Sequence, residues 1–367
     1  MKAKKIMFYI GSLAKAGAQR VIINLTESLI SKGHQVTIVT TGTVENEYEL
    51  PKGAHRIISD IQGEEITNSR ITNLKNRYCK LRGIWKSEKP DVIVSFIGKN
   101  NFMAILTAWG LKTPVVVSVR GEPNEEYYSR IMEFLAKTLM GKATGIILQT
   151  PDAVNYFPRW IQKKTIILGN PLNPNFIGDY YIGEKVDEIV SVGRMDLNKN
   201  HKLIIDAFYQ ISGDFPDVKL ILYGDGEERE KLIKYVGNGP CKERIFMPGA
   251  VTNIKEKIQK AKLFVLSSNT EGMPNALMEA LALGIPCVAT DCPCGGPKML
   301  MEGKENGILV PVGDSIKMAE AMRIILQDKE LWDKYSRNAY EIINDLNPEK
   351  VNSDWEEYLN LLINHKK

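Results

Sequence analysis

Ser268-Asn-Thr-Glu-Gly-Met-Pro-Asn-Ala-Leu-Met-Glu-Ala-Leu-Ala-Leu-Gly-Ile-Pro-Cys-Val-Ala-Thr-Asp-Cys-Pro-Cys-Gly-Gly-Pro297 is the stretch that decides the fold of this chain. The apolar run at residues 263–268 leads into it and predicts a buried strand. Pro274 fits the first turn of a following helix, because the N–H that proline lacks would have no partner there. Four residues then recur at helical spacing and would pack this helix on a sheet: Leu277, Ala280, Leu281 and Gly284.

Two acidic residues stand on either side of the predicted helix start. Glu271 lies in the loop, and Glu279 lies eight residues later on the helix, off its apolar stripe. The first N–H groups of a helix attract anions. Two carboxylates beside such a site suit a ligand with both a phosphate and sugar hydroxyls. The alternative is two solvated side chains on an ordinary strand–loop–helix unit.

The whole block resembles the donor-sugar-nucleotide signature of the retaining, GT-B-fold glycosyltransferases of family 4, in which an E-x7-E motif precedes a Gly-Gly-Pro loop. The resemblance recurs at further family motifs from residue 5 to about residue 315. The sequence looks like those of family members that build bacterial surface polysaccharides. The resemblance implies an α/β fold of two Rossmann-like domains whose parallel sheets face a central cleft. It also implies that Glu271 holds the sugar and Glu279 the ribose. The residues between them would contact the donor: Met273, Pro274, Asn275, Ala276 and Leu277.

The composition is that of an ordinary soluble protein. The chain has 367 residues, of which 44% are hydrophobic and 25% charged, and this length predicts two domains. No run approaches 18 apolar residues, so no membrane-spanning helix is expected. The apolar run before Gly11 is too short for a signal peptide. Five cysteines without framework spacing favour a reducing cytoplasm, and Cys292-Pro-Cys294 is interpreted as a turn rather than a metal or redox motif.

Charge is divided unevenly along the chain. Up to Asn170 there are 24 Lys and Arg against 14 Asp and Glu, whereas the remainder has 24 against 30. Residues 70–86 carry six basic residues and no acidic one. Tyr78, Ile84 and Trp85 would be available to insert, so this segment predicts a helix on an anionic membrane surface, or else a solvated helix face. No nucleic-acid recognition motif accompanies the charge, and nucleic acid is not expected as a partner.

Short apolar runs alternate with helical segments through both halves, which is typical of βαβ units with a parallel sheet. We expect domains at residues 1–170 and 171–345, joined by the Pro- and Asn-rich hinge at 169–175, and a final helix at 346–367 that returns to the first domain. The first domain would bind the acceptor and the second the sugar nucleotide. Strands are expected at residues 6–10, 36–39, 56–59, 92–96, 115–119, 145–148 and 165–168, and then at 189–192, 219–222, 245–246, 263–266, 287–289 and 308–310.

The loop after the first strand does not match a dinucleotide fingerprint. Gly11 and Gly17 have the wrong spacing, and the second strand ends without the acid that NAD binding requires. In the resembled family this loop contains Gly-Gly-Ala-Glu, and here Ala16 and Gln19 replace its first and last residues. Gly17 is retained, so the resemblance implies close approach of its backbone to the donor phosphates.

Arg120 and Glu122 follow the fifth strand, where ligands of α/β proteins bind. They are candidates for donor or acceptor contacts, or for a structural ion pair. No His lies between His55 and His201, so no catalytic His is expected.

The strand ending at Val192 leads into a loop with two cations, Arg194 and Lys199. The resemblance implies that these residues hold the nucleotide diphosphate. It also implies that Gly224 lets the backbone pack closely near the nucleotide, and that the backbone around Met247 meets the nucleobase.

Asp-x-Asp, the carboxylate pair of metal-dependent sugar transferases, does not occur in the sequence. We therefore expect neither a metal nor another cofactor, with cations and helix amides neutralising the leaving group. The expected activity is that of a cytoplasmic retaining hexosyltransferase, peripheral to the inner face of the membrane. It would move a hexose or N-acetylhexosamine from a nucleoside diphosphate sugar, a UDP-sugar above all, to a hydroxyl of a lipid-linked or polysaccharide acceptor. A GT-B epimerase of UDP-sugars and a non-catalytic binding subunit are the alternatives.

Overall fold

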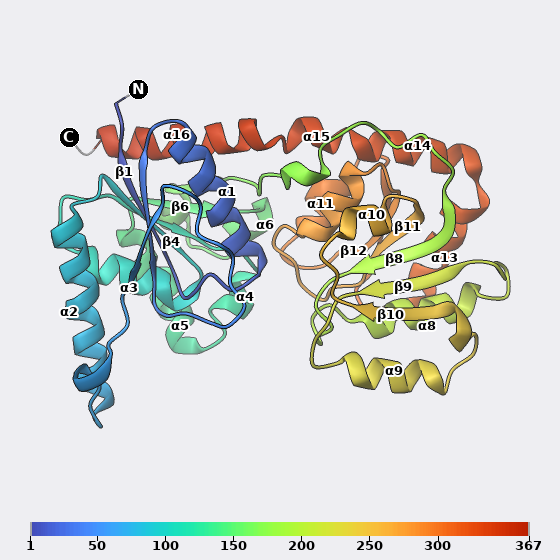
Figure 1. The fold of residues 1–367 in the computed structure, drawn as a ribbon, viewed down its shortest axis with the longest axis horizontal. Helices are drawn as coiled ribbons and strands as arrows, with labels where there is room; N and C mark the ends of the chain where they lie inside the picture. The colour runs from blue at the N-terminus through green and yellow to red at the C-terminus, as the bar shows by residue number, and fades with distance from the viewer. Residues whose placement is uncertain (1, 366–367) are drawn as a thin grey trace. The chain divides into compact units, whose positions relative to one another are not determined.

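The computed structural model describes residues 2–365, which fold into two compact units. The first comprises Met1–Pro171 with Glu349–Lys367, and the second comprises Leu172–Pro348. Each unit is an α/β domain built on its own sheet (Figure 1). Among the described residues, no helix combines the length and apolar character needed to cross a membrane.

The sheet of the first unit has seven strands in the order β3-β2-β1-β4-β5-β6-β7, all parallel. Parallel neighbours need crossover connections, and helices supply them except between β2 and β3, which a loop joins. The strands are β1 Lys5–Ile10, β2 Gln35–Thr40, β3 His55–Ile58, β4 Val92–Phe96, β5 Val115–Ser118, β6 Gly145–Leu148 and β7 Thr165–Ile167. The longer helices are α1 Gly17–Ser31, α2 Arg70–Glu88, α3 Gly98–Ala108 and α5 Arg130–Leu139.

The sheet of the second unit has six parallel strands in the order β10-β9-β8-β11-β12-β13. Its strands are β8 Val186–Val192, β9 Lys219–Tyr223, β10 Ile245–Gly249, β11 Ala261–Leu266, β12 Cys287–Thr290 and β13 Gly307–Val310. Its longer helices are α8 His201–Ile211, α9 Arg229–Gly237, α11 Asn275–Ala282, α13 Ser315–Gln327 and α14 Lys329–Tyr340. Two apolar clusters pack on the faces of this sheet, one beneath α8 and α13 and the other beneath α11.

The predicted fold class, two Rossmann-like α/β domains on parallel sheets, is confirmed. Each predicted strand overlaps an observed one, with differences of a few residues at the ends. The quoted stretch forms a strand, a loop and a helix as predicted. Pro274 is the N-cap residue of α11 rather than a member of its first turn, so the helix begins one residue later than expected.

The final helix, α16 Pro348–His365, packs on the first unit. Trp355 is fully buried, stacks on Phe96 with ring centroids 5.9 Å apart, and donates to the carbonyl of Gly169 at 3.4 Å. Glu356, also buried, accepts from Lys32 at 2.6 Å and contacts His34 Nε2 at 3.0 Å. The Trp355 ring and the Glu356 carboxylate thus hold this helix against β4 and against the turn between α1 and β2.

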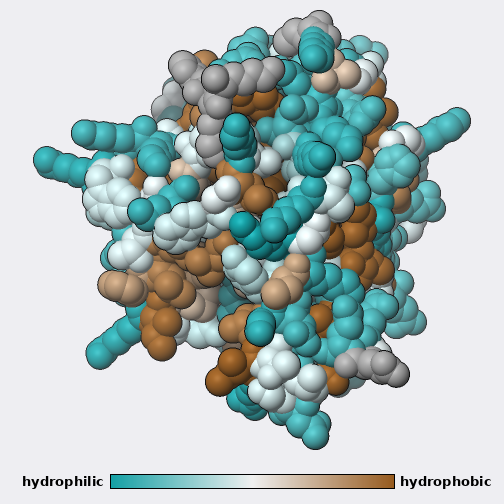
Figure 2. All heavy atoms as spheres, turned by 90° about the vertical axis from the view of Figure 1, so that its left-hand side faces the viewer, coloured by the Kyte–Doolittle hydropathy of each residue, from teal (hydrophilic) through white to brown (hydrophobic). Residues whose placement is uncertain are grey.

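Helix α2 lies at the left of Figure 1, and the face that carries it is seen in Figure 2, where brown apolar side chains lie among teal hydrophilic ones. Trp85 is 1% exposed and donates to Thr107 Oγ1 at 2.9 Å. The prediction that Trp85 is available to insert into a membrane is therefore wrong. Trp85 and Leu81 are the two buried residues of α2, so the Trp85 ring supplies most of the apolar contact between this helix and the core.

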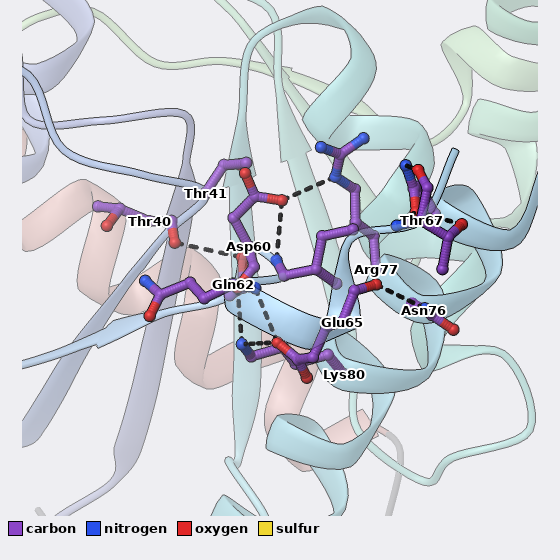
Figure 3. A network of polar contacts seen from close by, with 12 residues as sticks. Thr40, Thr41, Asp60, Gln62, Glu65, Thr67, Asn76, Arg77 and Lys80 are labelled. Atoms are coloured by element: carbon purple, nitrogen blue, oxygen red, sulfur yellow. Dashed lines mark hydrogen bonds and ion pairs between the residues drawn. The ribbon is translucent and has the colours of Figure 1, made fainter. Parts of the chain in front are cut away.

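Several basic side chains of α2 have partners within the first unit (Figure 3). Arg77 donates to Asp60 at 2.7 Å, and Lys80 donates to Glu65 at 2.9 Å and to the carbonyl of Asp60 at 2.6 Å. Arg82 donates to two backbone carbonyls of the α3 end, those of Thr107 and Trp109. These three cations bind α2 to neighbouring segments of the first unit, so this part of its basic face is not simply solvated.

Candidate active site

The candidate site lies at the carboxyl edge of the second sheet. Strands β9, β8, β11 and β12 are neighbours and run parallel, so the loops that follow them gather at one edge. These loops carry Gly224 after β9, Arg194 and Lys199 after β8, and Glu271 after β11. The structure thus brings together four residues from three loops that are far apart in the sequence.

Lys199 and Glu271 form an ion pair at the centre of this region. Their side chains are 22% and 11% exposed, so the pair is largely withdrawn from water yet accessible. Ser268 Oγ also donates to Glu271 Oε1 at 2.7 Å. The backbone of Glu271 is held by the loop after β12, since its N–H donates to Pro293 at 2.7 Å and its carbonyl accepts from Cys294 at 3.1 Å. Charge-assisted bonds and backbone bonds therefore fix the position of this carboxylate.

The loops after β8 and β11 are joined by Asn198, which the sequence analysis did not single out. Its Oδ1 accepts from the N–H and from the hydroxyl of Thr270, both at 3.0 Å, and its Nδ2 donates to the Thr270 carbonyl at 3.1 Å. Asn269 adds a bond to the Asn198 carbonyl at 2.8 Å, and Ser267 Oγ donates to the Lys199 carbonyl at 2.7 Å. The residues before Lys199 and Glu271 are thus hydrogen-bonded to each other. These bonds hold the two loops at the distance that the ion pair needs.

Arg194 is the exposed cation of the site. Its side chain is 78% exposed and contacts Asp196 Oδ2 at 3.0 Å, while Asp196 Oδ1 accepts from the N–H of Lys199 at 2.9 Å. One carboxylate therefore orders the turn between the two predicted diphosphate-binding residues and still leaves the Arg194 side chain in solvent.

Gly224 allows the loops after β8 and β9 to touch. Its φ is +137°, and a Cβ there would lie 1.8 Å from the carbonyl oxygen of Gly193. Its N–H donates to Gly249 at 3.0 Å. Asp225 accepts from Gly226 N within the same turn, as expected of a turn residue. Only glycine fits this close approach, which sets the position of the loop with Arg194.

The start of α11 presents backbone N–H groups. Met278 N donates the first bond of the helix ladder, to Pro274 at 3.1 Å, so Ala276 and Leu277 contribute N–H groups that precede the ladder. The side chains of Met273 and Leu277 are 5% and 0% exposed and lie in the core. Contacts of Met273 and Leu277 with a donor would therefore come from their backbone, whereas Asn275 and Ala276 are only partly buried. A Cβ at Gly296, in the Gly-Gly-Pro loop, would lie 1.6 Å from the Gly272 carbonyl, so the two loops pack backbone to backbone.

Two further predicted site residues, Glu279 and Met247, are held by the surrounding protein. Glu279 lies on α11 and is only 6% exposed. The carbonyl of Met247, on β10, accepts from Arg229 at 2.9 Å. Arg229 thus orders the backbone of the segment that the family resemblance assigns to the nucleobase.

His201 is a buried neighbour of the site that sequence reasoning missed. It begins α8 two residues after Lys199 and is 3% exposed, and its Nδ1 has no hydrogen-bond partner among the described residues. Burial, with a smaller contribution from the Lys199 charge, lowers its pKa to about 4. The imidazole is therefore neutral near pH 7, and adds volume but no charge beneath the Gly193 loop.

Arg120 and Glu122, in the first unit, both have structural contacts. The Arg120 guanidinium lies 5.6 Å from the Phe96 ring centroid and 5.8 Å from that of Trp355, and it donates to Asn170. Burial lowers its pKa to about 9. Glu122 caps the short helix α4 Pro123–Glu126 by accepting from Asn124 N at 3.1 Å. These contacts join each side chain to other residues, and they do not include an ion pair between Arg120 and Glu122.

Gly17 is exposed and begins α1, with Ala16 as the N-cap residue. Glu47, which sequence reasoning did not identify, holds the preceding loop by accepting from Leu13 N at 3.1 Å and from Arg56 at 2.6 Å. The hydrogen bond from Arg56 holds the pKa of Glu47 near 2. The loop before Gly17 is therefore anchored by a carboxylate that stays ionised.

The cysteines near the site are thiols. Burial, and then the charge of Glu271, raises the pKa of Cys292 to about 12. Within residues 2–365, no group of three or more His, Cys, Asp or Glu is placed to hold a metal ion.

Comparison with known families matches both halves of the chain. Residues 174–342 match "Glycosyl transferases group 1", and residues 16–168 match "Glycosyl transferase 4-like domain". The lipopolysaccharide core biosynthesis glycosyltransferase LpsE of Rhizobium meliloti is 30% identical over 344 residues, covering 89% of this chain and 90% of LpsE. An α-1,4-N-acetyl-D-galactosaminyltransferase of Campylobacter jejuni, whose name gives a diNAcBac-PP-undecaprenol acceptor, is 27% identical over 361 residues, or 96% of this chain and 97% of the relative.

Solved structures share the fold. HepE of Anabaena, solved in complex with UDP, aligns with a TM-score of 0.81 at 17% identity, covering 97% of this chain and 99% of that one. Sucrose-phosphate synthase of Thermosynechococcus elongatus aligns with a TM-score of 0.80 at 19% identity, covering 99% of this chain and 100% of that one. Fold and site thus define a GT-B glycosyltransferase. The chain belongs to the group 1 glycosyltransferases, as the resemblance of the 268–297 stretch predicted.

Proposed function

We propose that this enzyme transfers a hexose or N-acetylhexosamine from a UDP-sugar to a hydroxyl of a lipid-linked or polysaccharide acceptor, with retention of configuration and without a metal. The ion pair of Lys199 with Glu271 is the observation that carries the proposal. A cation that would suit a diphosphate and a carboxylate that would suit sugar hydroxyls lie side by side there, and Glu271 precedes the start of α11 by four residues.

The leaving diphosphate would be neutralised by the protein itself. Arg194 is exposed and can move onto a phosphate, while Lys199 is held at the site by Glu271 and by the turn that Asp196 orders. N–H groups at the start of α11 add a favourable dipole for an anion. Oriented groups that act on a leaving group commonly supply the largest part of catalysis. Gly17, at the start of α1, is proposed to let the backbone approach the donor phosphates.

Glu271 would hold the sugar hydroxyls and face the positive charge that develops at the anomeric carbon, and Glu279 would hold the ribose. The bond between the anomeric carbon and the diphosphate oxygen breaks as the acceptor oxygen bonds to the same face of that carbon. The departing phosphate takes the acceptor proton, so the products are the glycoside and UDP. This course needs no nucleophile–base pair.

The acceptor is proposed from the relatives. The Campylobacter relative has a diphospho-undecaprenol glycan acceptor in its name, and LpsE is named for the lipopolysaccharide core. A lipid-linked acceptor would keep this enzyme at the anionic inner face of a membrane, in agreement with the excess of Lys and Arg before Asn170.

A panel of sugar nucleotides tests the proposal. One UDP-sugar should raise the melting temperature and yield UDP together with a glycosylated acceptor. A donor at 100 times its Kd stabilises the folded state by about 2.7 kcal/mol. Conversion of the donor to another sugar nucleotide without transfer would indicate an epimerase instead, and stabilisation without any product would indicate a binding subunit.

A further inference from the structure

Helix α5 of the first unit exposes large apolar side chains to solvent. Ile131 is 73% exposed and Phe134 is 66% exposed, and Tyr128, just before the helix, is 74% exposed. Thr138 lies on the same face, and its hydroxyl donates to the Phe134 carbonyl at 2.6 Å, so its polar group is satisfied within the helix. Of the ten helix residues, Ala136 alone is fully buried. This face of α5 is thus an apolar stripe that no element of the described part of the chain covers.

Two tryptophans lie where α5 ends. The helix continues into the short turn η2 Met140–Lys142, and the ring of Trp160 packs against Gly141, where an added Cβ would lie 1.9 Å from the ring. Lys142 Nζ lies 5.7 Å from the centroid of the Trp109 ring. Trp109 and Trp160 are 60% and 51% exposed. Amphipathic aromatic rings of this kind are typical of the boundary between hydrocarbon and headgroups.

Cations lie along the C-terminal part of these apolar groups. From residue 130 to residue 164 the chain has six Lys and Arg against two Asp and Glu, whereas Glu122, Glu125 and Glu126 precede Tyr128. One of the two acids, Glu133, is paired with Lys137 at 2.5 Å. Arg130, Lys142 and Arg159 are exposed around the stripe. Apolar side chains bordered by positive charge complement an anionic bilayer better than they complement a neutral protein surface.

We propose that this α5 face, defined by Tyr128, Ile131, Phe134, Trp109 and Trp160 with these cations, inserts into the headgroup region of an anionic phospholipid bilayer. The inference deepens the proposed function and rests on its lipid-linked acceptor. Tyr128 lies only six residues after Glu122, which follows the carboxyl end of β5, so the face begins beside the edge of the sheet where an acceptor would bind.

Helix α2 is the competing face. It exposes Ile71 and Leu74, but its cations Arg77, Lys80 and Arg82 are bound to acidic side chains and carbonyls of the same unit. Arg70, Lys75 and Lys86 remain exposed on α2, as many cations as border the α5 face, but the tryptophan of α2 is buried. The two helices can therefore be compared directly by matched variants.

Co-sedimentation of the full chain with vesicles, without any acceptor, tests the proposal. The wild type should bind phosphatidylcholine vesicles that contain phosphatidylglycerol and should bind pure phosphatidylcholine poorly. Binding should weaken with salt, since the Debye length falls from about 10 Å at 0.1 M to about 3 Å at 1 M. Ile131→Asn combined with Phe134→Ser should weaken binding by about tenfold or more, because two large apolar groups no longer leave water.

Two double variants serve as controls. Ile71→Asn with Leu74→Asn changes α2, and Ile316→Asn with Ile324→Asn changes exposed apolar residues of α13 in the second unit. Both should bind vesicles like the wild type. Wild-type binding by the α5 variant, or loss of binding in the α2 variant alone, would overturn the proposal. So would a wild type that ignores anionic vesicles, or a dimer that only the α5 variant converts to a monomer, since the face would then bind a second copy.

Transfer to a water-soluble, short-chain acceptor separates this inference from the proposed function. The α5 variant should keep wild-type turnover with that acceptor and lose turnover with the same glycan carried in vesicles. Equal loss with both acceptors would contradict a membrane role. A wild type that binds vesicles but transfers sugar to neither acceptor would refute the proposed function and leave membrane binding established.

Discussion

The pair of Lys199 and Glu271 carries the chemistry proposed for this enzyme. Lys199→Ala and Arg194→Ala should each lower kcat by about 10²–10³, in line with the loss of one group that stabilises a leaving oxyanion. Steady-state kinetics with the preferred donor measures the effect. Lys202→Ala is the matched control, because Lys202 lies three residues further on and pairs only with Asp206 and the Tyr235 ring at the surface. Near-normal turnover in both site variants would contradict their assignment.

His201 makes stability depend on pH. Its pKa is about 4 in the folded protein against an ordinary value of 6.5, so between these pH values the unfolded chain binds a proton that the folded protein does not. The free energy of unfolding should therefore fall as the pH falls from 6.5 toward 4. One pKa unit corresponds to about 1.4 kcal/mol, so the loss from this residue is about 3 kcal/mol.

Urea unfolding at pH 7 and at pH 4.5 measures this contribution. His201→Gln has no titrating group, so its unfolding free energy should fall less between these two pH values than that of the wild type. Parallel pH profiles of the two proteins would show that His201 does not titrate as its burial requires.

Sequence reasoning identified Lys199 and Glu271 separately but not their contact. They are 72 residues apart, and only the order of β8 and β11 in the sheet makes them neighbours. Asn198 and Glu47 were missed because each supports the site through tertiary hydrogen bonds, and His201 because it does so by packing against the Gly193 loop. A polar residue in a loop gives no sign of such bonds in a single sequence. The position of His201, two residues after Lys199, was the one available hint.

At the scale of elements, the site depends on loops that touch backbone to backbone. Gly224→Ala should destabilise the protein by about 3 kcal/mol, because it combines a positive φ with a Cβ 1.8 Å from the Gly193 carbonyl. Donor binding should weaken as well, since that loop carries Arg194. Gly213→Ala is the control, with no atom within 4 Å of the added Cβ. Thermal unfolding that shows equal effects for both variants would contradict the close-approach argument.

The elements themselves were largely predictable. Parallel strands buried on both faces give continuous apolar runs, such as that of β4, and these are recognisable without a structure. The inner face of α2 was less predictable. Its basic residues alternate with apolar ones, and the sequence does not tell which apolar side chain meets the core. The acids that bind Arg77 and Lys80 lie in the segment before the helix, outside the helical pattern.

For the whole molecule, we predict that catalysis does not need a divalent cation. Arg194, Lys199 and the start of α11 would supply the positive charge that a metal supplies elsewhere. Initial rates should therefore be retained in excess EDTA. Complete loss of activity, restored by magnesium or manganese, would contradict this prediction and would require carboxylate ligands for the ion.

The stereochemistry of transfer tests the central claim most directly. The anomeric configuration of the product, followed by NMR from the first turnovers with the donor that the panel selects, shows on which face the new bond forms. We predict that an α-linked UDP-sugar gives an α-glycoside, in agreement with a reaction in which the leaving phosphate takes the acceptor proton beside Lys199 and Glu271. A β-glycoside would contradict this account, because it would require a general base on the opposite face of the sugar.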